Sequence, residues 1–305
     1  MSLVSVSEAD TPRTRRTKAA LWDLDAALVE ILRVHQPASV REVFYQAVVA
    51  NLVPKKDEVG YRVVQRRLAL LRRDGVIPYT WIADNSRRVV GYQRWYDPED
   101  FIRSISALYT RDYWADNDVR VEVWVEKEAL VGVLQPVVVD ELGLDLYPAR
   151  GFSSMSYLER AGATIREIGV ATHVYVLSDL DPSGVNIAEK IAEDLVRFAA
   201  PTDVVIARIA VTPEQVRTLR LPTRETTEKD PRAARFAREV GDFSVELEAI
   251  PPNTLRQIVR DAALRHMDPA RLARLRTIEA EERRGFDALA GKMRRSRRGF
   301  GVPDP

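Results

Sequence analysis

Apolar and polar positions in the first hundred residues recur with the 3.6-residue period of amphipathic helices. This pattern predicts three helices, over 21–34, from the N-cap Ser39 to about Val48, and over 57–73. Asp74 and Gly75 end the third helix, and the β-branched and aromatic run 76–95 predicts a hairpin. Three helices and a hairpin are typical of a winged-helix domain, which we place at 15–115, after a disordered tail at 1–14.

The pattern changes after a further helix, which begins at Asp97-Pro98-Glu99 and runs to about Trp114. Apolar runs then predict four strands, over 119–126, 144–149, 173–179 and 204–210. Helical patterns near 127–142, 154–168 and 185–199 separate them. This alternation predicts an α/β domain over 116–290, with a parallel sheet and helices on both faces. The part from Thr212 to about Arg295 reads as mostly helical, and a basic tail over 291–305 is expected to fray from Lys292.

Composition narrows the possible chemistry. The chain has no cysteine and only three histidines, so a metal site would have to use oxygen ligands. No apolar run is long enough for a membrane helix, and the first residues lack the apolar stretch of a secretory signal. We therefore expect a cytoplasmic protein.

The net charge of +1 conceals two regions of opposite charge. Between Arg33 and Arg94 there are 12 basic and 5 acidic residues, so 12 − 5 gives +7. Between Val121 and Ala200 there are 6 basic and 13 acidic residues, so 6 − 13 gives −7. The first region suits a polyanion and the second a divalent cation.

Three carboxylates are expected to meet where the first and third strands of the sheet end. Glu126 ends the first strand, and Asp179 and Asp181 end the third. Because two residues separated by one lie on the same side of an extended chain, Asp179 and Asp181 can face one ligand. Magnesium prefers such oxygen ligands. The structural alternative for Asp181 is an N-cap, since Pro182 follows it at a first helical position.

These runs resemble a known family. The segments 125–130 (VEKEAL), 150–152 (RGF) and 179–184 (DLDPSG) resemble the Toprim domain of topoisomerase VI A subunits. Further likeness at 212–215 and 245–250 extends the resemblance over about 38–268. It implies a Rossmann-like Toprim domain with a helical C-terminal extension that binds Mg2+ through Glu126, Asp179 and Asp181. Toprim domains also occur in nucleases and primases, so this part alone does not fix the reaction.

The N-terminal region carries the second part of the resemblance. The segment 41–45 (REVFY) resembles the motif that holds the nucleophilic tyrosine of topoisomerase VI A subunits and of the meiotic double-strand-break protein. The resemblance implies Tyr45 as nucleophile, and Arg41, one helical turn earlier, can reach the same phosphate. The family usually has two adjacent tyrosines where this chain has Phe44 and Tyr45, and a lysine where it has Arg150. The structural alternative for Tyr45 is an aromatic residue at the edge of the core.

Arginines on the third helix and at the hairpin predict contacts with DNA phosphates, with a solvated helix face as the alternative. We name as DNA-binding candidates Arg62, Arg66, Arg67, Arg73, Arg87, Arg88 and Arg150. The resemblance implies a homodimer that cleaves double-stranded DNA through a 5′-phosphotyrosyl bond, as a type IIB topoisomerase A subunit does. It also implies a possible ATP-binding B-type subunit, since this chain has no Walker loop. A Toprim nuclease that uses water and a DNA-binding module without catalysis remain as alternatives.

Overall fold

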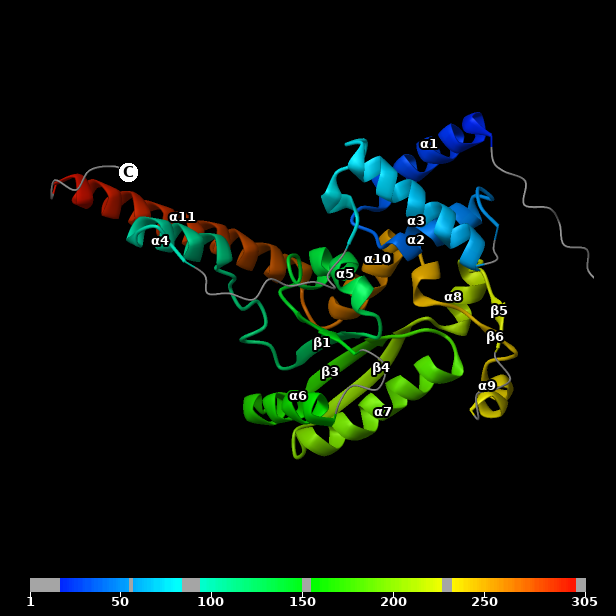
Figure 1. The fold of residues 1–305 in the computed structure, drawn as a ribbon. Helices are drawn as coiled ribbons and strands as arrows, with labels where there is room; N and C mark the ends of the chain where they lie inside the picture. The colour runs from blue at the N-terminus through cyan, green and yellow to red at the C-terminus, as the bar shows by residue number, and fades with distance from the viewer. Residues whose placement is uncertain (1–16, 55–56, 84–93, 150–154, 227–231, 300–305) are drawn as a thin grey trace, which may run out of the picture.

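The computed structural model describes residues 17–54, 57–83, 94–149, 155–226 and 232–299, with the backbone alone at 57–58 and 294–299. Its centre is a four-stranded parallel sheet of order β2-β1-β3-β4 (Figure 1). The strands are β1 (Arg120–Val125), β2 (Asp145–Pro148), β3 (Thr172–Leu177) and β4 (Val204–Ala210). All four predicted strands are confirmed. They are recognisable in the sequence because β1 and β3 are buried on both faces and are therefore almost continuously apolar.

Helices cover both faces of the sheet, as predicted (Figure 1). On one face lie α6 (Met155–Ile168) and α7 (Pro182–Ala199), packed on a core that includes Trp124 and Ile165. On the other face lie α5 (Val131–Val138) and α10 (Pro252–Ala263). The shorter elements are η2 (Glu128–Leu130), α8 (Pro213–Thr218), β5 (Arg224–Glu225), α9 (Ala233–Glu239), β6 (Phe243–Ser244) and η3 (Leu247–Ala249).

The N-terminal region is helical. It consists of α1 (Lys18–His35), α2 (Val40–Val49) and α3 (Asp57–Arg73). Ser39 caps α2 as predicted, in a capping box with Glu42, whose Oε2 accepts a 2.7 Å hydrogen bond from the Ser39 amide. The apolar faces of these helices belong to one continuous core that also includes β1, α5 and α10. The helical region is therefore packed directly against the α/β unit.

The hairpin predicted over 76–95 is not found in its described part. Residues 84–93, with Arg87 and Arg88, lie outside the described residues. Before them, Pro78 opens a 3-10 turn, η1 (Tyr79–Trp81), and a single parallel bridge joins Ala38 to Ile82. Proline fixes its own φ and has no amide hydrogen to donate, so a turn forms here although the neighbouring residues favour a strand.

The long helix α11 (Pro269–Gly299) projects from the body of the molecule, with α4 (Pro98–Leu108) lying along it (Figure 1). The prediction that α4 continues to Trp114 is wrong, because the residues after Leu108 turn to bind α11. Tyr109 and Tyr113 donate hydrogen bonds of 2.9 and 2.7 Å to Glu282 and Glu279. The prediction that the chain frays from Lys292 is wrong for the described residues, because the backbone is helical as far as Gly299. Among the described helices, none has the length and apolar character needed to cross a bilayer.

Candidate functional site

Two of the three predicted carboxylates meet where β1 and β3 end. Because the two strands are parallel neighbours, Glu126 after β1 and Asp179 after β3 lie at one edge of the sheet. The Glu126 Oε2 atom accepts a 2.9 Å hydrogen bond from the amide of Asp179. Asp181 is close enough to raise the pKa of Glu126 through charge repulsion, in addition to the larger effect of burial. At this edge a hydrogen bond joins Glu126 to Asp179, whereas Asp181 acts on Glu126 through its charge.

Backbone amides orient the two aspartates. Oδ1 of Asp179 accepts a 2.8 Å hydrogen bond from the amide of Leu247, and Oδ1 of Asp181 accepts one of 2.6 Å from the amide of Gly184. Asp181 is the N-cap of α7 and Pro182 occupies the first turn, so the structural alternative for Asp181 is confirmed. An N-cap uses one carboxylate oxygen, and the second can still bind a cation.

A lysine that the sequence analysis did not single out lies within the acidic cluster. The Lys127 ammonium is 2.8 Å from Asp179, 2.6 Å from Glu248 and 3.6 Å from Glu246. These carboxylates raise the pKa of Lys127 although its burial opposes the shift. The available signal was its place between Glu126 and Glu128 directly after a buried strand. Lys127 supplies positive charge that partly offsets the negative charge of the carboxylates at this end of the sheet.

Burial changes the titration of the aspartate that Lys127 contacts. The Asp179 side chain is only 11% exposed, and burial raises its pKa to about 7 although Lys127 opposes the shift. Glu246 differs. Burial would raise its pKa, but Lys127, Arg41 and Arg224 together lower it. The charged form of Glu246 is therefore favoured, in contrast to the raised pKa of Asp179.

Tyr45 and Arg41 extend from α2 toward the same cluster. The Tyr45 side chain is buried, at 4% exposure, against Phe44, with ring centroids 5.2 Å apart. Arg224 on β5 donates a hydrogen bond to the Tyr45 hydroxyl, which also hydrogen bonds to Glu246. Arg41 lies 3.3 Å from Oε2 of Glu246 and Arg224 lies 2.7 Å from Oε1. Arg41 and Tyr45, the two residues predicted to be catalytic, therefore both interact with Glu246.

These contacts form one continuous network. It runs from Tyr45 through Arg224 to Glu246, on to Lys127, and from there to Asp179. The antiparallel bridge between Leu180 and Val245, with hydrogen bonds of 2.8 and 3.0 Å, holds the segment of Glu246 beside Asp179. The fold thus joins Tyr45, the residue predicted as nucleophile, to Asp179, one of the residues predicted as metal ligands, within one chain.

No protein-family model and no curated protein matches this chain. The roles that the resemblance assigns to Tyr45, Arg41 and the three carboxylates therefore rest on the motifs and on the geometry of the site.

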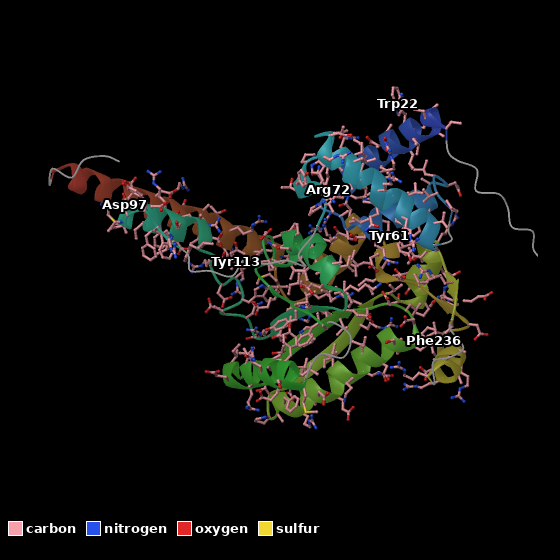
Figure 2. All side chains as sticks on the ribbon, viewed as in Figure 1. Trp22, Tyr61, Arg72, Asp97, Tyr113 and Phe236 are labelled. Carbon is pink, nitrogen blue, oxygen red and sulfur yellow. The ribbon has the colours of Figure 1, made fainter. Side chains whose placement is uncertain are left out.

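A cavity of about 600 Å³ opens beside the network, between the helical region and the turn after β1. Arg41 and Glu248 lie in its wall, and α3 contributes Tyr61, Gln65, Arg66 and Arg72. Tyr61 and Arg72 are labelled in Figure 2. The Arg41 guanidinium lies 4.8 Å from the centre of the Tyr61 ring. This basic, partly aromatic wall is suited to an anionic ligand with flat groups.

The predicted DNA-binding arginines fall into three groups. Arg62, Arg66 and Arg73 are exposed on α3. Arg67 instead points toward α1 and forms a two-bond ion pair with Asp25, with the two side chains 21% and 16% exposed. The others lie outside the described residues: Arg87, Arg88 and Arg150. Arg67 is thus committed to a contact within the helical region.

The donor set fits a hard divalent cation, because all the candidate ligands are oxygens and backbone amides hold them in place. Glu126, Asp179 and Asp181 are the residues that would hold it. As the side chains stand, no three Asp, Glu or His residues of the described part form a metal-binding group. Lys127 pairs with Asp179, so a cation at this site would compete with the ammonium.

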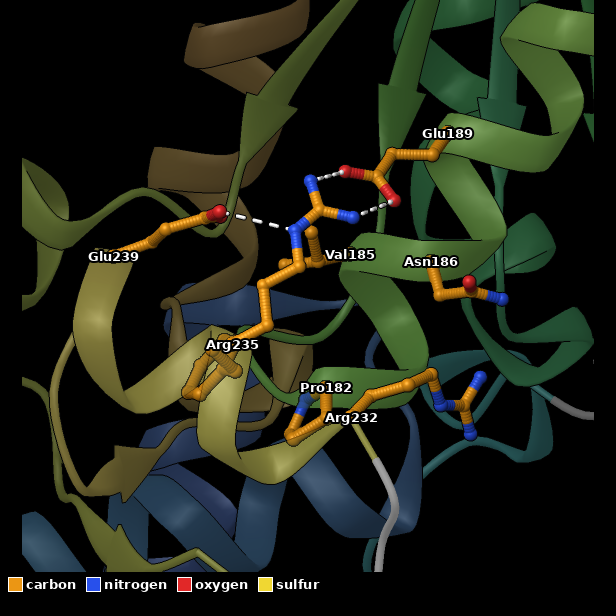
Figure 3. Close-up of a pocket in the computed structure, with 8 residues that line it drawn as sticks. Pro182, Val185, Asn186, Glu189, Arg232, Arg235 and Glu239 are labelled. Carbon is orange, nitrogen blue, oxygen red and sulfur yellow. Dashed lines mark hydrogen bonds and ion pairs between the residues drawn. The ribbon is translucent and has the colours of Figure 1, made fainter.

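A second hollow lies where α9 packs on the start of α7 (Figure 3). Pro182 and Arg232 line it, and Arg235 spans Glu189 at 2.6 Å and Glu239 at 3.0 Å. Its volume of about 30 Å³ has room for a water molecule but for no nucleotide. This hollow belongs to the packing that holds α9 against α7.

Proposed function

We propose that this chain cleaves double-stranded DNA by magnesium-dependent tyrosine transesterification, in the manner of a topoisomerase VI A subunit. The observation that carries the proposal is the network from Tyr45 through Arg224, Glu246 and Lys127 to Asp179. Two motifs that resemble one family, far apart in the sequence, meet in this network. A chance likeness in either motif gives no reason for them to meet.

Tyr45 and Arg41 have separate roles in the proposed reaction. The Tyr45 oxygen attacks phosphorus and loses its proton, the phosphorus–O3′ bond breaks, and the leaving 3′-oxygen takes up a proton. The products are a phosphotyrosyl bond to the 5′ end and a free 3′-hydroxyl. Arg41 lies one helical turn before Tyr45 and can bind the same phosphate, where its charge stabilises the transition state. Mg2+, when bound, supplies Lewis-acid stabilisation of the phosphate and the leaving oxygen.

The architecture supports this proposal in outline. A parallel sheet with acidic residues at the ends of two neighbouring strands is consistent with a Toprim domain. The three N-terminal helices are consistent with a winged-helix domain, in which α3 and the cavity beside it would receive the DNA. Contacts to phosphates, rather than to bases, would account for most of the affinity.

We further propose that the active form is a homodimer, since a double-strand break needs two copies of the nucleophile. The family pairs the tyrosine of one protomer with the metal site of the other, whereas here Tyr45 contacts Arg224 of its own chain. An ATP-driven cycle would need a B-type partner. Location in the cytoplasm is consistent with such a function.

Two observations favour the alternatives. The burial of Tyr45 and its hydrogen bond to Arg224 are also what a structural tyrosine shows, and they favour a Toprim nuclease that activates water. The ion pair between Lys127 and Asp179 favours a DNA-binding module without catalysis, because an internal cation compensates the acidic cluster.

Incubation with supercoiled plasmid and Mg2+ separates the three functions. The transesterase predicts nicked or linear DNA with protein attached to the 5′ ends, and loss of cleavage in Tyr45→Phe and Asp179→Ala. Tyr157→Phe is the matched tyrosine control, because Tyr157 packs on Trp124 at the opposite face of the sheet. Cleavage that persists in Tyr45→Phe and leaves unmodified ends supports the nuclease. Binding without cleavage in any variant supports the module.

A further inference from the structure

Three cationic side chains converge on the carboxylate of Glu246. Arg41 approaches from α2 at 3.3 Å, Arg224 from β5 at 2.7 Å, and Lys127 from the end of β1 at 3.6 Å. Each comes from a different element, and together they contact both oxygens of the carboxylate. Lys127 also pairs with Asp179 and Glu248, at 2.8 and 2.6 Å, whereas Arg41 and Arg224 give this one carboxylate two guanidinium partners. The site has the composition of an anion-binding site with Glu246 as its internal occupant.

We infer that the Glu246 carboxylate stands where a DNA phosphate binds, and that Arg224 is the second guanidinium of this phosphate site. The inference rests on the proposed function and names the part of the site that takes the scissile phosphodiester. Guanidinium groups bind phosphate oxygens through two parallel N–H donors, as they bind a carboxylate. A phosphodiester carries one negative charge and would replace the charge of Glu246 one for one.

The position of the site relative to Tyr45 supports this reading. Arg224 donates to the Tyr45 hydroxyl and to Glu246, so a phosphate in place of the carboxylate would lie beside the tyrosine oxygen. That is the placement an attacking oxygen requires. Arg224 would then contact both the nucleophile and the phosphate, while Arg41 holds the phosphate from the other side.

Access to the site is also adequate. The side chains of Arg41, Arg224 and Glu246 are 37%, 33% and 19% exposed, so a ligand can reach them without unfolding of the core. Arg41 also lies in the wall of the 600 Å³ cavity beside α3. A DNA strand in this cavity would meet the site through Arg41. Entry of the phosphate would require Glu246 to rotate away, which makes the carboxylate an internal competitor of DNA.

The test measures binding of a short DNA duplex to the full chain in EDTA, by fluorescence anisotropy over a range of salt concentrations. Glu246→Gln should lower Kd about five- to tenfold at 0.1 M salt and steepen the salt dependence by about one phosphate contact. Arg224→Gln should raise Kd, and in the double variant the gain from Glu246→Gln should be lost. Glu246→Asp, which shortens the side chain, should also tighten binding.

Glu141→Gln is the matched control, since Glu141 is part-exposed, lies 2.6 Å from Arg260, and loses the same charge on substitution. Equal effects of Glu246→Gln and Glu141→Gln, weaker binding in Glu246→Gln, or no binding of the duplex by any variant would overturn the inference. The assay needs no cleavage. Tighter binding by Glu246→Gln in a protein that forms no covalent adduct would keep the phosphate site and reject transesterification. A covalent adduct without tighter binding by Glu246→Gln would support transesterification and reject the phosphate site.

Discussion

The guanidinium of Arg224 donates a hydrogen bond to the hydroxyl of Tyr45, across the boundary between the N-terminal helices and the α/β unit. Arg224 belongs to the two-residue strand β5. This strand pairs with β6, which lies just before Glu246 in the chain. The contact therefore joins the predicted nucleophile to the segment that also orients Asp179 through the Leu247 amide. It makes the position of Tyr45 depend on the same segment as that of the predicted metal ligands.

Arg66 and Arg67 are adjacent on α3 but should respond differently to substitution. Arg66→Gln should weaken DNA binding and reduce its salt dependence by about one contact, with stability unchanged. Arg67→Gln breaks the pair with Asp25 and should lower the free energy of unfolding by about 1–3 kcal/mol. Urea denaturation and anisotropy measure the two effects. Equal loss of DNA affinity in both variants at a temperature where both are folded would show that Arg67 faces DNA.

Gly184 should not tolerate a side chain. A Cβ atom there would lie 2.4 Å from the carbonyl oxygen of Asp179, because the first turn of α7 packs on that backbone. Gly184→Ala should therefore shift Asp179 and lower both stability and any magnesium-dependent activity. Gly285→Ala is the control: nothing lies within 4 Å of its Cβ, and it should stabilise α11 by about 0.4–1 kcal/mol. Thermal unfolding checks both, and an unchanged Tm in Gly184→Ala would contradict the packing.

Glu42 should make stability fall as pH rises. Burial raises its pKa from 4.5 to about 8, so between these values the folded protein keeps a proton that the unfolded chain has lost. The contribution is complete below pH 4.5 and is lost by pH 8, with a slope of at most about 1.4 kcal/mol per pH unit. Glu42→Gln should reduce this slope, because Gln does not titrate. Denaturation at pH 5.5, 6.5 and 7.5 in both proteins tests it, and equal slopes would exclude Glu42 as the cause.

Mg2+ should stabilise the folded protein, since a ligand that binds only the folded state raises Tm. The increase should be reduced in Asp181→Asn, which keeps an acceptor for the Gly184 amide but loses the charge. Asp145→Asn is the control, because Asp145 lies at the other end of the sheet and pairs with Arg120. Equal increases in the wild type and Asp181→Asn would place Mg2+ elsewhere or exclude a specific site.

The parallel sheet and the meeting of Glu126 with Asp179 could be predicted because both follow from local patterns. Buried strands are continuous apolar runs, and in a parallel sheet their carboxyl ends share an edge. Ser39 and Asp181 were recognisable as N-caps for a similar reason, since a cap depends on a few neighbouring residues.

The rest of the site depends on contacts that leave no periodic signal. Arg224 lies in one two-residue strand and Glu246 follows another, and both strands are too short to show alternation. Their pairing and the single bridge between Leu180 and Val245 hold this segment in place. Lys127 was visible in the sequence, but its pairing with Glu248 depends on that same long-range placement. The predicted hairpin failed in its described part because Pro78 favours a turn in a run whose composition otherwise favours a strand.

The most direct test of the central claim is to identify the protein atom that becomes joined to DNA. After reaction of the full chain with plasmid and Mg2+, the denatured mixture is digested with nuclease and protease, and the peptides are analysed by mass spectrometry. The account predicts a peptide in which Tyr45 carries a 5′-phosphonucleotide, together with free 3′-hydroxyl ends on the DNA. Cleaved plasmid with unmodified 5′-phosphate ends, or an adduct on another residue, would contradict it.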